Sequence, residues 1–536
     1  MLKKIPKQVV EILQKLEENN FEAYIVGGCV RDLIMDRMPK DWDVTTDAKP
    51  EEIQKIFPDS FCENEFCTVG VKTPTAELTQ KETQIDAEKI QRNSAVSPRE
   101  SATKVVEVTT YRIESKYSDK RRPDKVIIAE TLEEDLGRRD FTMNAVALKI
   151  TNHKKQNTNK TQITNNNIQT DYEIVDLYGG QEDIKKKIIR TVGNPHERFD
   201  EDALRMMRAI RFHAELGFEI EKNTFEAVQK YHGHMKHIAL ERIKDELTKI
   251  ILSDNPASTR GDASSTRGGA SEGIDMLHQT GLLEYVIPEL EKGVGVKQNR
   301  HHIYTIYNHS ILSLKHCPSK KLEVRLASLL HDIAKPQTKR GEGEFATFYN
   351  HDHVGARVVE KILTRLRFSN EIIQKVKLLV DNHMFYYNPD EVGESSVRRL
   401  IQKVGLENMK DLINVRIADR LGSGVPKAKP YKLRHLEYMI DKVSTHAVSV
   451  KMLKINGNDL MRDLKIKPGP KIGAILDVLL AEVIEDAEKN KKDILLARAK
   501  ELDAEDLEKL RKMAKEKIEE KKEEDDEEIK NKHWVK

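Results

Sequence analysis

The sequence predicts an α+β amino-terminal part followed by an all-α body. Within residues 1–150, short runs of β-branched and aromatic residues are separated by turn-forming residues, as the strands of a sheet would be. From roughly Asp183 onward, apolar residues recur at helical spacing. Strands that come first and helices that follow are typical of the α+β class.

The first expected element is an amphipathic helix, whose apolar residues recur at helical spacing: Val9, Ile12, Leu13 and Leu16. Five short strands are expected after it, at Tyr24–Val26, Asp43–Thr45, Thr68–Lys72, Val105–Thr110 and Val126–Ile128. A glycine pair and a helix-period segment separate the first two strands. The chain therefore begins with a helix and then a strand, a glycine turn, a helix and a second strand.

Three polar segments without a sustained period interrupt this pattern, at 73–103, 152–171 and 257–273. The third is rich in Gly and Ser and contains the sequence STRG twice. We interpret all three as surface insertions, because the entropy cost of closing a loop grows slowly with its length. After Glu501 the chain is a dense run of Lys and Glu, which predicts a solvated helix or a disordered tail.

The composition limits the possible classes of protein. A chain of 536 residues is long enough for several domains, and its net charge of only +2 excludes a uniformly basic nucleic-acid coat. No C-x-x-C pair indicates a zinc site or a disulfide framework among the four cysteines Cys29, Cys62, Cys67 and Cys317. We find no signal peptide and no apolar run of membrane-spanning length, so we expect a cytoplasmic protein with no membrane partner.

Two aspartates separated by one residue form the first candidate site. Asp41 and Asp43 flank Trp42 at the start of a run of β-branched residues. Alternate side chains of a strand share a face, so we expect the two carboxylates to project together. Paired carboxylates suit a hard cation such as Mg²⁺, which usually binds substrate phosphates as well. A D-x-D pair at an exposed strand end is also common without a metal. Considered by itself, this pair does not exclude that alternative.

The glycine pair Gly27 and Gly28 lies at the turn between the first strand and the next helix. Glycine lets backbone N–H groups approach an anion closely. Together with the two carboxylates, this turn indicates a nucleoside triphosphate held by metal on one side and by the backbone on the other.

Two later motifs place arginines beside acids. Residues 138–145 read RRDFTMNA, which suits phosphate and ribose recognition, although a salt-bridged helix start would look similar. Residues 201–208 read EDALRMMR on a strongly helical stretch, which puts Asp202 and Arg205 on one face. That pair can accept from the amino group and donate to the ring nitrogen that cytosine and adenine both present, and it mismatches uracil and guanine. The alternative is an ordinary i,i+3 ion pair.

Six motifs, in this order, resemble those of the bacterial-type (class II) tRNA nucleotidyltransferase and poly(A) polymerase family: GGCVRD, DWDVTTD, EVTTYR, RRDFTMNA, DLYGGQEDI and EDALRMMRAIRF. The resemblance covers most of residues 1–255 outside the insertions. It implies a polymerase-β-like nucleotidyltransferase head, with a mixed sheet and helices, and then a helical neck.

The same resemblance implies roles for the matching residues. Asp41 and Asp43 would be catalytic carboxylates that hold Mg²⁺, and Glu107 lies where a third carboxylate is expected. Nucleotide binding would fall on the remaining motif residues: Gly27, Gly28, Arg31, Arg139, Asp140, Asn144, Asp202, Arg205 and Arg208. The family's base-selecting pair corresponds to Asp202 and Arg205. Residues 114–124 resemble the flexible loop that is implicated in switching from C to A addition.

A second constellation of His and Asp residues lies in the helical body. An adjacent His-Asp pair follows an apolar helix in LASLLHDIAKP, and both residue types bind several divalent metals. The alternative is a set of core or surface histidines whose hydrogen bonds are made within the protein, without a metal. The pattern resembles an HD-domain phosphohydrolase, which implies a dinuclear centre for a divalent metal of unspecified identity, held by His309, His331, Asp332 and Asp419 together with His351 and His383. His353 competes with His351, which has the family's offset before Gly355.

These resemblances divide the chain into a head (1–150), a helical neck (171–255), an HD domain (274–445), a helical RNA-binding region (446–500) and a charged tail (501–536). They imply an enzyme that adds CMP and AMP from CTP and ATP to tRNA 3′ ends without a nucleic-acid template. The HD domain would hydrolyse phosphomonoesters or 2′,3′-cyclic phosphates on RNA ends, or would serve only as a scaffold for tRNA. The nearest alternative is a poly(A) polymerase or A-adding enzyme, and an RNA-binding HD phosphohydrolase with a silent head is the alternative from another class.

We predict that the Asp202→Ala, Arg205→Ala double variant loses its discrimination against UTP and GTP, because the base edge is then no longer read by a carboxylate and a guanidinium. Incorporation of each of the four nucleotides into tRNA, measured separately, checks this. Unchanged selectivity would show that the pair does not act as the template.

Overall fold

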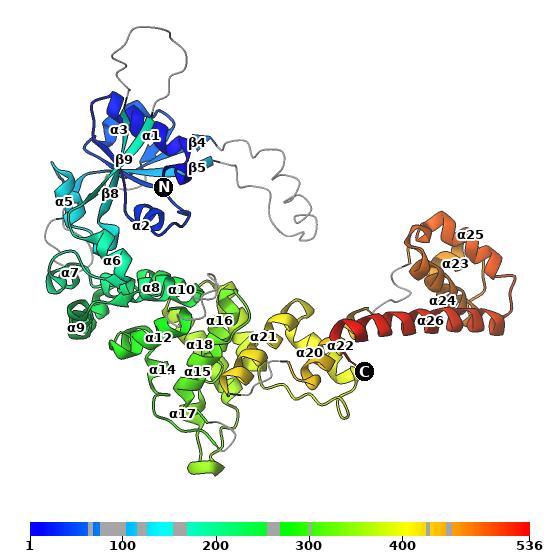
Figure 1. Ribbon diagram of the computed structural model, residues 1–536. Helices are drawn as coiled ribbons and strands as arrows, with labels where there is room; N and C mark the ends of the chain where they lie inside the picture. Colours follow the sequence, from blue (N-terminus) through cyan, green and yellow to red (C-terminus); the bar gives the residue numbers. More distant parts are fainter. Residues whose placement is uncertain are drawn as a thin grey trace, which may run out of the picture. The chain divides into compact units, whose positions relative to one another are not determined.

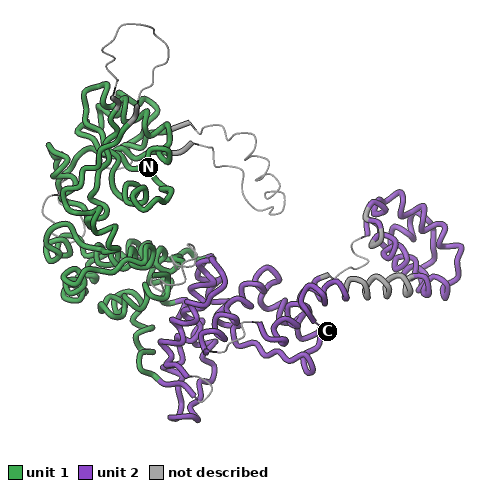
Figure 2. Tube along the Cα trace, viewed as in Figure 1, with its two compact units in different colours: residues 1–296, 361–370 green, residues 297–360, 371–536 purple. Residues whose placement is uncertain are grey.

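The protein consists of two compact units (Figure 2). The computed structural model describes residues 1–62, 68–74, 103–114, 126–153, 169–254, 268–299, 303–424, 429–445 and 453–535. Unit 1 comprises residues 1–296 and 361–370, and unit 2 comprises residues 297–360 and 371–536. Strands occur in unit 1, and the described part of unit 2 is helical, which confirms the predicted α+β class. Most of each predicted insertion, and most of the expected flexible loop, lies outside the described residues.

A mixed seven-stranded sheet forms the centre of unit 1 (Figure 1). Its strand order is β3-β4-β5-β2-β1-β8-β9, in which β2 and β5 run parallel and the other neighbours run antiparallel. The strands are β1 Ala23–Val26, β2 Asp43–Thr46, β3 Ser60–Cys62, β4 Thr68–Pro74, β5 Thr103–Thr110, β8 Val146–His153 and β9 Gln169–Asp176. A separate hairpin pairs β6 Arg112–Glu114 with β7 Val126–Ile128.

All five predicted strands are present, but the sequence pattern missed six others, of which four lie in this sheet and this hairpin. Strands β8 and β9 extend into both ends of the predicted insertion at 152–171. Strand β9 lies at the edge of the sheet and exposes Asp171, Tyr172 and Glu173, so it lacks the alternation of a half-buried strand. Strands β3 and β6 have only three residues each and include polar residues, unlike the wholly apolar β7.

Alternation along β1 divides the core of the head between the two faces of the sheet. Ala23 and Ile25 belong to the cluster that packs with α1 (Lys7–Glu18) and α3 (Pro50–Ile56). Tyr24 and Val26 belong to a second cluster with Tyr111 and Leu136. The predicted amphipathic helix is therefore confirmed as α1, and all four of its expected apolar residues are buried.

Helices complete unit 1 after the sheet. Helix α8 is almost wholly buried, because its apolar residues pack on several sides. Two short strands, β10 Ile188–Ile189 and β11 Glu219–Ile220, pair within the region predicted to be purely helical. The helices are α2 Gly28–Ile34, α5 Leu132–Gly137, α6 Gly180–Lys186, α7 Pro195–Glu201, α8 Leu204–Leu216, α9 Lys222–Tyr231, α10 Leu240–Leu252, α12 Ala270–Gln279, α13 Leu283–Val286 and α14 Pro288–Glu291.

Unit 2 carries a second, helical core. Its helices are α15 Ile306–Lys315, α16 Leu322–Leu330, α17 Lys335–Thr338, α18 His351–Arg365, α19 Asn370–Asn382, α20 Glu394–Val404, α21 Leu406–Gly422, α22 Tyr431–Thr445, α23 Gly457–Asp463, α24 Pro470–Glu485, α25 Lys492–Leu502 and α26 Leu507–His533. The last residues of α18 and the first residue of α19 are grouped with unit 1. None of the helices in the described ranges is long and apolar enough to cross a membrane.

The charged carboxyl-terminal segment forms a single helix, α26, of 27 residues. Its Asp526 pairs with Lys442 of α22 at 2.9 Å and accepts a hydrogen bond from Tyr438. Lys532 and His533 both pair with Asp441 of α22, at 2.7 and 2.9 Å. Of the two structures expected for this segment, the helix is therefore the one observed, and its end is held by specific ion pairs.

We predict that Gly180→Ala lowers the free energy of unfolding of unit 1 by about 1–3 kcal/mol, the usual cost of overpacking. A Cβ at this position would lie 2.5 Å from Val146 Cγ2 and closer still to the carbonyl oxygen of Thr142, a backbone atom. Urea denaturation followed by circular dichroism measures the change. Gly233→Ala is the matched control, because its Cβ would meet only the Tyr285 hydroxyl, at 3.6 Å. Equal stability of both variants would contradict the prediction.

Candidate functional site

Three carboxylates gather at the start of β2. Asp43 is the first residue of β2 and is the register partner of Glu107 on the parallel strand β5. The backbone N–H of Glu107 donates to the carbonyl of Trp42 at 3.2 Å, which fixes the two strands at this point. Asp41 precedes β2, as it precedes the predicted strand Asp43–Thr45, so only Asp43 lies on the strand. Burial raises the pKa of Asp43, the Arg139 guanidinium opposes this shift, and the nearby Asp41 carboxylate adds to it.

Gly27 lies against two of the predicted site residues. Its φ of +79° is in the left-handed region, which favours glycine. An added Cβ would be 3.1 Å from Arg139 Nη1 and 3.4 Å from Asp43 Oδ2. The structure thus brings together the glycine turn, the first carboxylate of β2 and the second arginine of the RRDFT motif.

A buried carboxylate that the sequence interpretation missed holds both arginines of this motif. Asp135 is fully buried, and it pairs with Arg138 at 2.7 Å and Arg139 at 3.1 Å. Thr45 of β2 also donates to it, at 3.3 Å. Although burial raises the pKa of Asp135, the two guanidinium groups hold it below its ordinary value. The i,i+3 and i,i+4 spacing from Asp135 to the two arginines was the signal that could have identified it.

Four of the predicted nucleotide-binding residues form one hydrogen-bonded chain. Arg208 donates to Asp140 Oδ2 at 2.7 Å, and Asn144 donates to Asp140 Oδ1 at 3.1 Å. Arg31 donates in turn to the Asn144 side-chain oxygen at 3.0 Å. Burial opposes the ionised form of Asp140, but the Arg208 guanidinium and the Asn144 amide lower its pKa to about 2. This chain connects α2, the RRDFTMNA segment and α8.

The predicted base-selecting residues, Asp202 and Arg205, do not lie on one face of a single helix as expected. Helix α7 ends at Glu201 and α8 begins at Leu204, so Asp202 lies between two helices in an extended conformation. Its Oδ1 accepts from the Leu204 N–H at 2.9 Å, which is the capping role that aspartate favours at a helix start. Its Oδ2 pairs with Arg242 of α10 at 2.9 Å. Arg205 pairs with Glu201 at 2.8 Å. The expectation that Asp202 and Arg205 are i,i+3 neighbours on one continuous helix is therefore wrong. The two residues have separate partners.

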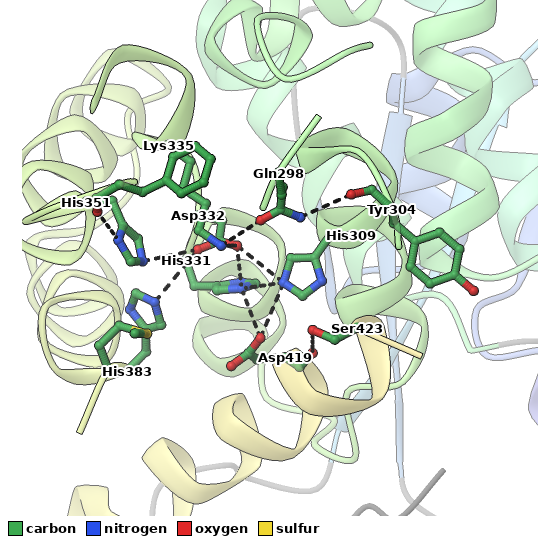
Figure 3. Close-up of polar contacts among 12 residues, drawn as sticks. Gln298, Tyr304, His309, His331, Asp332, Lys335, His351, His383, Asp419 and Ser423 are labelled. Carbon is green, nitrogen blue, oxygen red and sulfur yellow. Dashed lines mark hydrogen bonds and ion pairs between the residues drawn. The ribbon is translucent and has the colours of Figure 1, made fainter. Parts of the chain in front are cut away.

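The second constellation converges on one buried cluster in unit 2 (Figure 3). His309, His331 and Asp332 form a group whose ligand atoms all lie within 4.8 Å of one another, and Asp332, His351 and His383 form another. Asp419 joins the first group, since its Oδ1 lies 3.3 Å from His309 Nε2. The structure thus brings together all six residues that the sequence indicated. His353 points elsewhere and pairs with Asp381 at 2.7 Å.

The donor set of this cluster fits divalent metal ions. Asp332 is shared by the two groups, with Oδ2 at 3.3 Å from His309 Nε2 and Oδ1 at 3.4 Å from His351 Nε2. Burial and the nearby His331 lower the pKa of His383 to about 3. At His309, by contrast, burial is outweighed by the Asp332 and Asp419 carboxylates, which raise the pKa to about 9. His383 Nε2 is buried, and among the described residues it has no hydrogen-bond partner. A buried ring nitrogen without a partner, facing a shared carboxylate, is the arrangement that a metal ion would satisfy.

Comparison with known proteins places the chain in a family. Residues 23–190 match the poly A polymerase head domain, residues 217–260 match the family described as "probable RNA and SrmB-binding site of polymerase A", and residues 345–499 match domain 2 of tRNA nucleotidyltransferases. The CCA-adding enzyme of Ligilactobacillus salivarius is 31% identical over 498 residues, which cover 92% of this chain and 96% of that protein. The chain belongs to the class II CCA-adding enzyme family. This membership confirms the family and the nucleotidyltransferase class predicted from the motifs.

Further members of the family agree with this assignment. The CCA-adding enzyme of Enterococcus faecalis is 29% identical over 511 residues, which cover 92% of this chain and 95% of that protein. The crystal structure of the Bacillus stearothermophilus CCA-adding enzyme in complex with CTP matches with a TM-score of 0.53 and 24% identity, over 93% of this chain and 97% of that one. That match supports the fold of a nucleotidyltransferase head followed by helices.

We predict that Asp135→Ala lowers stability by about 3 kcal/mol, because two partly buried guanidinium groups lose their fully buried partner. The misplaced Arg139 should also reduce kcat/KM for CTP incorporation about a hundredfold at a temperature where the variant stays folded. Urea denaturation and single-nucleotide incorporation measure the two effects. Glu133→Ala, an exposed acid on the same helix, is the control and should change stability by less than about 0.5 kcal/mol. Lost stability with normal kinetics would mean that Asp135 has no part in positioning Arg139.

Proposed function

We propose that this protein adds CMP and AMP, in the order that builds CCA, to tRNA 3′ ends without a nucleic-acid template. Family membership supports the reaction. The observation that carries the site is the register pairing of Asp43 with Glu107, next to Gly27 and Arg139. Carboxylates on neighbouring strands beside a guanidinium suit a metal-bound triphosphate.

In this proposal Asp41, Asp43 and Glu107 hold Mg²⁺. When bound, two such ions activate the attacking 3′-hydroxyl and stabilise the departing pyrophosphate. Arg139 and the backbone at Gly27 and Gly28 orient the triphosphate. The guanidinium of Arg139 lies beside Gly27, and the guanidinium of Arg31 lies beside Gly28. Asp135 keeps Arg139 in place, so that the phosphates meet a preformed positive group.

Base selection falls on Asp202 and Arg205. Arg242 holds one oxygen of Asp202, and the start of α8 holds the other, so the carboxylate is fixed in direction before a base arrives. The guanidinium of Arg205 is fixed by Glu201 and by the carbonyl of Arg138, at 3.2 Å. A fixed acceptor and a fixed donor at a constant separation would accept the edges of cytosine and adenine and reject those of uracil and guanine.

A second function is favoured by the cluster in unit 2. We propose that His309, His331, Asp332, His351, His383 and Asp419 hold a pair of divalent metal ions and that this site hydrolyses phosphate esters on RNA ends. Bound metal would supply a water of lowered pKa as nucleophile. The protein contributes a dry, preformed ligand set, because all six side chains are buried or nearly so.

The test offers three tRNA transcripts, which end before CCA, after C and after CC, to the purified protein with Mg²⁺ and CTP, ATP or both. Stepwise addition that stops at CCA is the expected product, read by sequencing the 3′ ends. Long A tails would identify a poly(A) polymerase, and A added only after CC would identify an A-adding enzyme. The Asp41→Ala, Asp43→Ala variant should lose all incorporation, because the metal carboxylates are gone, and should keep any phosphate release.

Asp332→Ala is the reciprocal variant for the same assay. It should lose bound metal, measured by plasma mass spectrometry, and lose phosphate release while CCA addition continues. Incorporation that persisted in the Asp41→Ala, Asp43→Ala variant would overturn the assignment of the head. Phosphate release without incorporation by the unmodified protein would leave the HD-type site as the only activity.

A further inference from the structure

A rim of exposed aromatic and sulfur-containing side chains borders the His/Asp cluster of unit 2. Two segments form it: residues 345–349, which lead into His351, and residues 384–386, which follow His383. Four of these side chains expose half of their surface or more: Phe345 (80%), Tyr349 (72%), Met384 (50%) and Tyr386 (69%). Large exposed apolar side chains that flank residues of a buried polar site in the sequence point to a surface that binds a ligand.

Arg416 connects the rim with the cluster. Its Nη1 lies 2.8 Å from Asp419 Oδ2 and 4.0 Å from Met384 Sδ. Its guanidinium carbon lies 5.8 Å from the centre of the Phe385 ring. A guanidinium that contacts an aromatic ring at one edge and a proposed ligand carboxylate at the other lies where a negatively charged substrate group would approach the cluster.

The segment before His351 has a similar arrangement. Lys335 places its Nζ 2.7 Å from Asp332 Oδ2 and 5.6 Å from the centre of the Phe348 ring. Its position is fixed by Gln298, whose side-chain oxygen accepts from Lys335 Nζ at 2.7 Å. Each of the two rim segments therefore pairs an aromatic ring with a cation that reaches a carboxylate of the cluster.

We propose that the rim binds the base of an unpaired terminal nucleotide while the cluster binds the phosphate of that nucleotide. The inference rests on the proposed hydrolytic function and names its substrate class: nucleotides at single-stranded RNA ends, in preference to phosphate esters without a base. Aromatic faces for bases, combined with cations for phosphates, are what single-stranded RNA recognition requires. A base-free phosphate ester would use the cations and leave the exposed rings without a role.

Two phosphomonoesters of a secondary alcohol separate the base from the phosphate: adenosine 2′-phosphate and glycerol 2-phosphate. In the Tyr349→Ala, Tyr386→Ala variant of the full chain, we expect KM for adenosine 2′-phosphate to rise about tenfold, the order found for one base on one aromatic ring. The kinetics with glycerol 2-phosphate should not change. Tyr386→Phe keeps the ring and should behave as the unmodified protein. Trp534→Ala removes an exposed aromatic side chain outside the rim and serves as the second control.

A binding measurement without metal makes the test independent of turnover. After treatment with EDTA, adenosine 2′-phosphate is titrated calorimetrically into the unmodified chain and each variant, all of which share the same head. If the double variant alone loses affinity, the rim proposal is supported. If neither ester is hydrolysed, the hydrolase proposal is overturned, but the rim proposal is not. Unchanged binding and kinetics in the double variant, or an equal loss with both esters, would overturn the rim proposal.

Discussion

The arrangement of the head depends on one buried carboxylate, that of Asp140. It joins Arg208 on α8 to Asn144, and Asn144 holds Arg31 on α2. An ion with so little exposure stays charged only because these partners replace the water that it has lost. The segments predicted to contact the phosphates are therefore held by the same ion as α8, the helix that follows the aspartate proposed to select the base. Displacing Arg208 would leave the Asp140 carboxylate without its paired cation in the interior.

The cluster in unit 2 shows a different way to build a site. Its histidines and acids come from five places along the chain, and several lie where helices begin or end: His331 at the end of α16, His351 at the start of α18 and His383 directly after α19. Residues at helix ends are less constrained by the helical repeat, so their side chains can converge from different directions. The site is thus a product of helix packing, and local sequence supplies only the residue types.

Much of the molecule could be predicted from the sequence, because its strongest signals are local. The helix α1 follows from the period of its apolar residues and the strand β1 from a short apolar run, and the site residues follow from motifs of fixed spacing. Asp135 was missed because a buried acid looks like an exposed one in sequence until its two arginines are placed beside it. The break between α7 and α8 was missed for a related reason: Asp202 lies in a helix-forming stretch, and only its contacts with Leu204 and Arg242 reveal the interruption.

The conformation and surroundings of Gly27 limit which residues this position can accept. Its backbone conformation disfavours every other residue, and the space beside it is already taken by Arg139 on one side and Asp43 on the other. A larger residue would be strained in its backbone and would press on the end of the Arg139 side chain, while its Cβ would make an ordinary contact with Asp43. Position 27 is therefore restricted to glycine by its backbone as well as by its neighbours.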